Sequence, residues 1–275
     1  MAAGWVEIGE RVFVRRYAFF DQNIVAILGR EEALVLDTRT TPAQAREILD
    51  DLRELGSPPV GVVVNSHGHY DHAFGNSVFR PVPICGHERC AAMIQRVGER
   101  MRASAAAAMA EIRGDLSDVV LDPPDRTFSE RATICLDDGR EVELRYLGRG
   151  HTDNDVVLSV DGADVLCAGD LLENGAPPSF DDAYPLDWPA TVEALLSTLG
   201  SSTLVVPGHG DPGGRAFVAE QLAGFRAVAD AAHRVHAGEA SVDELLSMVP
   251  YPAVAARLPI ERALAQVRGE LDDAA

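Results

Sequence analysis

The stretch Ser66-His67-Gly68-His69-Tyr70-Asp71-His72 directly follows an apolar run, Val60-Gly61-Val62-Val63-Val64, that is typical of a buried strand. His67 and His69 are two residues apart, so in an extended segment both side chains point to the same side. Asp71 and His72 follow where the chain is expected to turn, and they can face a second point close to the first. Imidazole and carboxylate ligands suit zinc, and also manganese or iron. The stretch therefore predicts a metal site at the end of a strand.

Further metal-ligating residue types stand at three other predicted strand ends. Each follows a strand-like segment and has a glycine directly beside it: His151, Asp170 and His209. Glycine has no side chain, so it lets the neighbouring backbone and side chains approach an ion closely. We expect these residues to converge with the stretch 66–72 on one site. The histidines at 87, 233 and 236 are interpreted as ordinary helix residues.

The charge of the chain argues against a nucleic-acid enzyme. The formal net charge is −19 over 275 residues, and all 24 basic residues are arginine. Proteins that bind nucleic acids usually carry a basic surface that neutralises phosphates, and a strongly acidic protein repels polyanions. We therefore expect a small-molecule substrate and no nucleic-acid partner.

The chain carries no recognisable targeting or membrane segment. Its N-terminus lacks the basic and apolar regions of a secretion signal, and no apolar run is long enough to cross a bilayer. The four cysteines lack the paired spacing of a zinc knuckle or a redox dithiol, and each lies in or beside an apolar stretch. We expect reduced, buried cysteines in a cytoplasmic protein without a membrane partner. The sequence does not indicate the oligomeric state.

Hydrophobic periodicity predicts an α+β protein. Residues 5–37 are β-rich, and residues 42–55 have apolar positions at helical spacing, with Thr40 or Thr41 as the N-cap. Turns of the Asp-Gly type predict hairpins around residues 133–147 and 156–168. Helices are expected from Pro189 to about Leu199 and over 213–236. We interpret residues 1–275 as a single domain with a helical tail at about 237–275.

A helical insertion is expected at about 87–125. Residues 87–112 are rich in helix formers, and residues 115–126 contain prolines and acids that favour a loop. Because the insertion lies between predicted metal ligands, it is a candidate lid over the site. A surface insertion without that role explains the pattern equally well.

Several aromatic and basic residues are candidates for a substrate pocket. Phe180, Tyr184 and Trp188 lie in a predicted loop over 174–188, and Tyr70 lies within the histidine stretch. Arg149 is close to His151 and has the charge to bind a substrate carboxylate. The alternative is that the loop aromatics anchor the loop to the core and that the arginine is an ordinary surface residue.

The ordered pattern His67-x-His69-x-Asp71-His72, Gly150-His151, Gly169-Asp170 and Gly208-His209 resembles the metallo-β-lactamase superfamily. The resemblance spans roughly residues 10–212. It implies a four-layer αββα sandwich, to which extra C-terminal helices are added here. It also implies a dinuclear site along one edge of the sandwich.

The resemblance also implies a role for each residue of the pattern. His67, His69 and His151 would hold one metal, Asp71, His72 and His209 would hold the other, and Asp170 would bridge them. Asp37, at the end of an early strand, matches the family's usual first acidic position. It would not bind a metal itself but would orient the ligands and their loop.

Two zinc ions held in this way imply a hydrolase. A hydroxide shared by the two metals would attack an ester, thioester, lactone or lactam, with Asp71 orienting or deprotonating the water. Asp170 and the absence of lysine resemble glyoxalase II, lactonases and thioesterases more than the commonest zinc β-lactamases, which carry cysteine at that position. A β-lactamase-like lactam hydrolase and a mononuclear iron persulfide dioxygenase-like oxidoreductase remain as alternatives.

Overall fold

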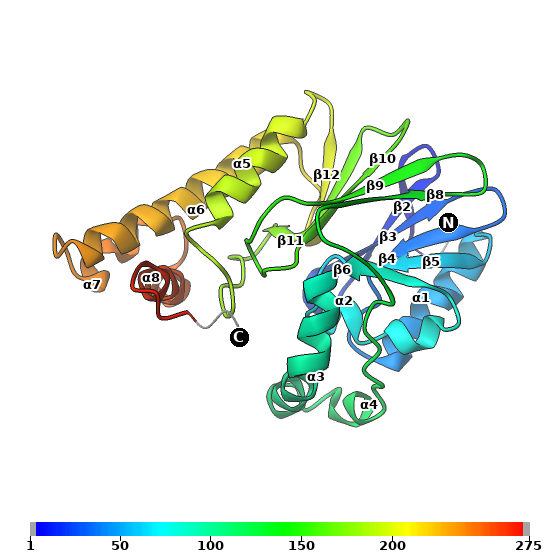
Figure 1. The fold of residues 1–275 in the computed structure, drawn as a ribbon, viewed down its shortest axis with the longest axis horizontal. Coiled ribbons are helices and arrows are strands. Elements are labelled where there is room, and N and C mark those ends of the chain that lie inside the picture. Colours follow the sequence, from blue (N-terminus) through cyan, green and yellow to red (C-terminus); the bar gives the residue numbers. More distant parts are fainter. Residues whose placement is uncertain (1–3, 272–275) are drawn as a thin grey trace.

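In the computed structural model, which describes residues 4–271, the strands form one continuous hydrogen-bonded path (Figure 1). Its first half follows the order β7-β6-β5-β4-β3, with β2 and then β1 added to β3, and its second half follows β12-β11-β10-β9-β8. The strands of the first half are β1 (Val6–Gly9), β2 (Val12–Tyr17), β3 (Gln22–Leu28), β4 (Ala33–Leu36), β5 (Val60–Val64), β6 (Ile84–His87) and β7 (Arg126–Phe128). Those of the second half are β8 (Arg131–Cys135), β9 (Glu141–Tyr146), β10 (Val156–Val160), β11 (Val165–Glu173) and β12 (Leu204–His209). The two halves are joined by the pairing of His209 with Gln22.

The helices lie on both sides of the strands (Figure 1). They are α1 (Pro42–Leu55), α2 (Tyr70–Ala73), α3 (Glu88–Ala108), α4 (Arg113–Ser117), α5 (Trp188–Thr198), α6 (Arg215–His236), α7 (Val242–Leu245) and α8 (Ala253–Val267). Short 3₁₀ helices occupy Phe19–Asp21, Asn76–Phe79 and Leu246–Met248.

Strands with two buried faces explain the layers. In β3, Val25 and Ile27 belong to a core that both halves of the sheet share, whereas Ile24 and Ala26 pack in a core with α1. In β11, Cys167 faces the shared core while its neighbours face α5 and α6. Successive side chains of a strand point to opposite faces, so each half is covered by helices on one face and by the other half on the second. The predicted α+β sandwich of four layers is confirmed.

Local sequence signals fix the ends of α1. The side chain of Thr41 accepts a hydrogen bond from Gln44 N, and Pro42 occupies the first turn, where its missing N–H costs nothing. Gly56 ends the helix with a φ of +77°, a left-handed conformation that glycine adopts without strain. One of the two N-cap residues proposed from the sequence is therefore the actual cap.

The region from 80 to 130 differs most from the sequence prediction. Strands β6 and β7 were not predicted, and the expected long helix begins only after His87, which ends β6 and accepts a hydrogen bond from Arg89 N as the N-cap of α3. The expected loop from Asp115 contains the end of α4. Cys135 is also exposed, whereas burial was expected for every cysteine.

The expected helical tail is present within the described residues. Helix α8 packs against α6 through Ala256, Ile260 and Ala263, which share the core of α5 and α6. These helices stand to one side of the sheet, next to β11 and β12 (Figure 1). Among the described helices, none has the length and apolar content to cross a membrane.

Candidate metal centre

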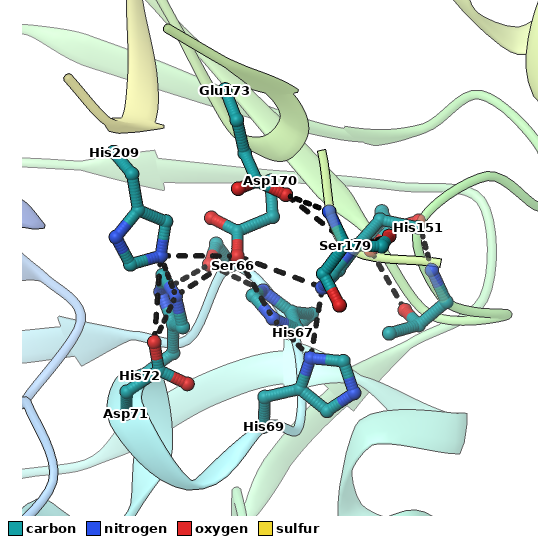
Figure 2. A network of polar contacts seen from close by, with 12 residues as sticks. Ser66, His67, His69, Asp71, His72, His151, Asp170, Glu173, Ser179 and His209 are labelled. Atoms are coloured by element: carbon teal, nitrogen blue, oxygen red, sulfur yellow. Dashed lines mark hydrogen bonds and ion pairs between the residues drawn. The ribbon is translucent and has the colours of Figure 1, made fainter. Parts of the chain in front are cut away.

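The predicted ligands converge on one another from segments far apart in the sequence (Figure 2). His67 follows β5, and His69 directly precedes α2. Helix α2 itself supplies Asp71 and His72. The others come from the loop after β9, from within β11 and from the end of β12, and they are His151, Asp170 and His209. All of these side chains are buried except those of His69 and His209, which are partly buried.

One set of imidazoles points its nitrogens at a common centre. His69 Nδ1 lies 3.0 Å from His67 Nε2 and 2.8 Å from His151 Nε2. Zinc binds histidine nitrogen at about 2.0–2.1 Å, so adjacent donors of a tetrahedral ion lie about 3.3 Å apart. The spacing of this set is close to that required to hold one metal ion.

A second set has the same spacing. Asp71 Oδ2 lies 3.4 Å from both His72 Nε2 and His209 Nε2, and the two nitrogens lie 3.3 Å from one another. These three donor atoms are therefore placed for a second ion.

Asp170 lies between the two sets, as Figure 2 shows. Its Oδ2 is 3.8 Å from His67 Nε2 and 3.5 Å from His151 Nε2 in the first set. It is 3.3 Å from His72 Nε2 and 3.2 Å from His209 Nε2 in the second. Its Oδ1 is buried without a hydrogen-bond partner. A buried carboxylate oxygen without a partner is costly unless a cation or a donor satisfies it, so the residues present fit a bound metal.

The outer nitrogen of each imidazole faces an oxygen atom. The partners are Ser66 Oγ for His67, Asp182 for His69, Asp37 for His72, Ser179 O for His151 and Phe20 O for His209. An imidazole that donates its outer N–H keeps the lone pair of the other nitrogen free for a metal. The whole set is therefore oriented for metal binding by neighbours that are not ligands.

Asp37 orients two parts of the site at once. Its carboxylate accepts hydrogen bonds from Ser66 N and Ser66 Oγ at 2.7 Å, and it lies 2.8 Å from His72 Nδ1. Its φ is +68°, a left-handed conformation that is uncommon outside glycine. This strained residue sits where the sequence pattern placed an orienting acid.

Glycine is required beside Asp170 for steric reasons. A Cβ atom on Gly208 would lie 1.7 Å from Asp170 Oδ1, far inside contact distance. The close approach of β11 and β12 is therefore possible only because residue 208 has no side chain.

The loop that carries His151 is held by hydrogen bonds of the residues that follow this histidine. Asp155 accepts hydrogen bonds from Thr152 N and Thr152 Oγ1, at 2.8 and 2.7 Å. Asn154 Oδ1 accepts from Gly68 N at 2.9 Å, which ties this loop to the one that carries His67 and His69. The two loops are thereby fixed relative to one another.

Protons compete with cations for this site. Burial opposes the charged form of His209, but Asp170 and Asp71 raise its pKa to about 11. Burial acts in the same sense on His69, and Asp182 outweighs it and raises the pKa to about 9. Burial and the charge of His69 lower the pKa of His151 to about 4. Two imidazoles that face carboxylates therefore keep a proton near neutral pH when no cation is bound.

Metal affinity is expected to rise with pH between pH 6 and pH 8. Since the pKa of His69 is about 9, its proton must leave before the nitrogen can bind a cation throughout this range. Each released proton contributes up to about tenfold in affinity per pH unit. Titrating zinc into the protein by calorimetry, in buffers of different ionisation enthalpy, measures the zinc affinity and the number of protons that are released on binding. An affinity that is constant over the range would contradict the assignment of these imidazoles as ligands.

Two carboxylates at the site were not predicted from the sequence. Asp182 Oδ2 lies 2.9 Å from His69 Nε2, and the charge of His69 outweighs the effect of burial to lower the Asp182 pKa to about 2. Glu173 is buried, accepts a hydrogen bond from Ser179 N, and lies 4.0 Å from His151 Nδ1. Burial and the nearby Asp170 raise the pKa of Glu173 to about 8. Neither residue belongs to a spacing motif, so no local signal marked it.

Replacing Asp182 with asparagine should weaken metal binding by about 10–100-fold, because losses of this size follow removal of the group that orients a ligating imidazole. The neighbouring Asp181 is exposed, so Asp181→Asn is a matched control with the same change of charge. Competition with a chromogenic chelator measures the zinc dissociation constant of both variants. Equal affinities in the two variants would show that the contact with His69 does not support metal binding.

The candidate pocket residues divide into two groups. Trp188 is fully buried and Phe180 is 2% exposed, and both lie in the core with Phe225, so they do not line a pocket as proposed. Tyr184 is also largely buried, but with Arg149 it lines a cavity of about 500 Å³. Tyr70 is partly buried, and its ring lies 6.1 Å from that of Phe20. The loop aromatics at 180 and 188 are anchors because their rings complete the core under α5 and α6.

Sequence comparisons place the chain among known proteins. A family model described as the Metallo-beta-lactamase superfamily matches residues 17–209. The Metallo-beta-lactamase type 2 of Bacteroides fragilis is 24% identical over 205 residues, which cover 73% of this chain and 74% of that protein. The enzyme of the same description from Bacillus cereus is 25% identical over 202 residues, covering 71% of this chain and 70% of its own.

Solved structures share the fold. A metallo-beta-lactamase from Pontibacter korlensis aligns with a TM-score of 0.63 and 22% identity, over 81% of this chain and 98% of that chain. A double mutant of the sec-alkyl sulfatase PisA1 aligns with a TM-score of 0.75 and 19% identity, over 98% of this chain and 51% of that chain. The family match covers more than half of the sequence and includes every predicted ligand. The chain therefore belongs to the metallo-β-lactamase superfamily.

Proposed function

We propose that this protein is a dinuclear zinc-dependent hydrolase that cleaves a small-molecule ester, thioester, lactone or lactam. The observation that carries the proposal is the position of Asp170 Oδ2, which lies 3.2–3.8 Å from nitrogens of both ligand sets. A carboxylate shared in this way favours two ions over one, because a single ion needs only one of the sets.

Bound at these residues, two divalent ions would lower the pKa of a water molecule towards neutrality and polarise an acyl carbonyl. The protein supplies orientation. Burial opposes ionisation of Asp71, but His72 and His209 hold its pKa well below the usual value, so the carboxylate stays charged at neutral pH. Asp71 is 9% exposed, and its charged carboxylate is placed to accept a hydrogen bond from a water molecule and so to orient it.

The apolar surroundings of Tyr70 support a small acyl substrate. Tyr70 packs against a cluster that contains Phe74 and Leu116 of α4, and Phe20 is 38% exposed beside it. An apolar surface at the edge of a metal site can hold the hydrocarbon part of a substrate and exclude water. The net charge of −19 agrees with a small-molecule partner rather than a nucleic acid.

A lactam is the second candidate substrate. It is favoured by the similarity to two metallo-beta-lactamases over more than two thirds of the chain. Asp170 stands where the commonest zinc β-lactamases carry cysteine, and the chain contains no lysine to bind an antibiotic carboxylate. The sequence features therefore rank esters, thioesters and lactones before lactams.

A hydrolysis panel tests the proposal. It contains a thioester, a lactone, a chromogenic lactam, a phosphodiester and a secondary alkyl sulfate, each assayed with zinc-loaded protein and with chelator-treated protein. We expect zinc-dependent cleavage of at least one acyl substrate and little cleavage of the phosphodiester. Cleavage of the sulfate alone would overturn the acyl assignment. An iron-containing protein that hydrolyses nothing and consumes oxygen with a persulfide would favour the dioxygenase alternative.

A further inference from the structure

The candidate ligand His209 lies at the junction between the two halves of the sheet. It pairs with Gln22, and this pairing joins β12 to β3. Its Nδ1 donates a hydrogen bond of 2.7 Å to the backbone oxygen of Phe20. The next residue, Gly210, donates from its N to the backbone oxygen of Asp21 at 2.9 Å. The segment that carries this ligand is therefore attached to the short 3₁₀ helix Phe19–Asp21, which directly precedes β3.

The backbone of that 3₁₀ helix is strained. Phe20 has a φ of +60° and Asp21 a φ of +55°, and both values belong to the left-handed region that residues with a side chain seldom adopt. Two such residues in succession persist only where the surrounding contacts outweigh their cost. Contacts beyond the backbone are therefore needed to hold this segment, whose Phe20 oxygen fixes the orientation of the His209 ring.

Arg16, on β2, supplies contacts of this kind. Its Nε and Nη2 donate to the two carboxylate oxygens of Asp21, the second at 2.6 Å, and its Nη1 donates to Asp211. A guanidinium group suits this arrangement, because its planar fork binds one carboxylate through two donors and has a further donor for another. Asp21 directly precedes β3, and Asp211 follows His209 by two residues at the end of β12. One side chain thus connects the two segments that meet at the ligand.

We propose that Arg16 is a positioning residue for the second ligand set, and that it fixes His209 by clamping Asp21 to Asp211. The proposal rests on the dinuclear centre proposed above. Arg16 is exposed and is not one of the candidate ligands, so it acts on the centre only through its two carboxylate partners. The first ligand set does not include His209, and its ion should therefore not depend on Arg16.

The charge and the geometry of Arg16 have opposite effects on cation binding. A positive charge near a cation site repels the cation, so loss of that charge alone would raise the affinity for zinc. Loss of the clamp releases the strained segment, and the oxygen that orients His209 is then no longer held in place, so the affinity should fall. The sign of the change therefore separates a positioning role from a simple electrostatic one.

Calorimetric titration of the chelator-treated protein with zinc tests the assignment, because two ions give two binding steps. We expect Arg16→Ala to weaken one step by about 10-fold. This is the lower limit for loss of a group that orients a ligand, and it applies because Arg16 acts one contact further out. Arg16→Lys keeps the charge but lacks the fork, so it should weaken the same step. Asp182→Asn, which removes the partner of His69, should weaken the other step.

Arg53→Ala is the matched control for the change of net charge. Arg53 forms an exposed ion pair with Asp50 in α1, a helix that supplies none of the candidate ligands. Both zinc affinities should therefore stay close to those of the unsubstituted protein. Circular dichroism establishes that each variant is folded, and Arg16→Lys decides the question if the alanine variant is not.

The outcomes that would overturn the proposal are distinct from a failure of the centre itself. An affinity that is unchanged or higher without the Arg16 fork would exclude the positioning role and leave the dinuclear centre intact. Weakening of the step that Asp182→Asn affects, or a loss equal to that in Arg53→Ala, would exclude it as well. An unsubstituted protein that binds only one ion would overturn the proposal together with the dinuclear centre. The titration needs no turnover, so it does not depend on the substrate.

Discussion

Replacing Asp170 with asparagine is expected to lower kcat/KM by at least about 100-fold and to remove one of the two proposed metal ions. The amide has the size of the carboxylate but lacks its charge, so it cannot satisfy both ligand sets. Asp170 Oδ2 lies 3.3 Å from His72 Nε2 and 3.5 Å from His151 Nε2, and loss of such a shared donor weakens both sets. Losses of about 10–100-fold follow removal of groups that only orient a ligand, so loss of a ligand should exceed them.

The control for this variant is Asp161→Asn, which makes the same chemical change in the exposed turn between β10 and β11. Asparagine is well accepted in such a turn, so fold and activity should be preserved. Elemental analysis and the steady-state rate on the best panel substrate are measured on both variants. An Asp170→Asn protein that retains two metals and full activity would refute the bridging role.

Replacing Trp188 with alanine is expected to lower the free energy of unfolding by about 3–5 kcal/mol, the cost of truncating a large buried aromatic side chain. Trp188 is fully buried, stacks on Phe225 with centroids 4.2 Å apart, and donates a hydrogen bond from Nε1 to Leu171 O. The truncation therefore leaves a cavity between α5 and α6 and a backbone oxygen without its partner.

Urea denaturation followed by circular dichroism measures the change. Trp188→Phe keeps an aromatic ring at the position, and it should retain more of the stability than Trp188→Ala does. If Trp188 lined a substrate pocket instead, the alanine variant would keep its stability and change only KM. That result would contradict the assignment of this ring to the core.

The sequence predicted the candidate ligands because they are marked locally. His67, His69, Asp71 and His72 form one short motif, and a glycine stands beside each of the more distant ligands. The structure shows why that glycine is needed at 208, where any Cβ would collide with Asp170. The glycine at 208 is thus the consequence of a steric requirement at the site, and a single sequence displays it.

Asp182 illustrates what a single sequence does not display. It contacts His69 across 113 positions, and it stands in a loop with other acids such as Asp181 and Asp187. The path of the chain after β11 places Asp182 against the imidazole of His69, and nothing in the local sequence distinguishes it from the neighbouring acids. Glu173 is similar, since it lies on a fully buried strand where the pattern predicts apolar residues.

A short strand and the role of two loop aromatics were the other features that could not be predicted from the sequence. Strand β7 has three residues and follows two prolines, so its pairing with β6 depends on tertiary context and not on its own propensity. Phe180 and Trp188 have the composition of a pocket wall or of a core equally. Their burial depends on α6, which places Phe225 against both rings and which the local sequence of the loop does not indicate.

The most direct test of the proposed dinuclear centre is the metal content of the protein after dialysis against zinc, measured by elemental analysis. The geometry of the two ligand sets and of Asp170 between them predicts close to two zinc ions per chain. Full hydrolytic activity in a protein that holds only one metal ion per chain would contradict it.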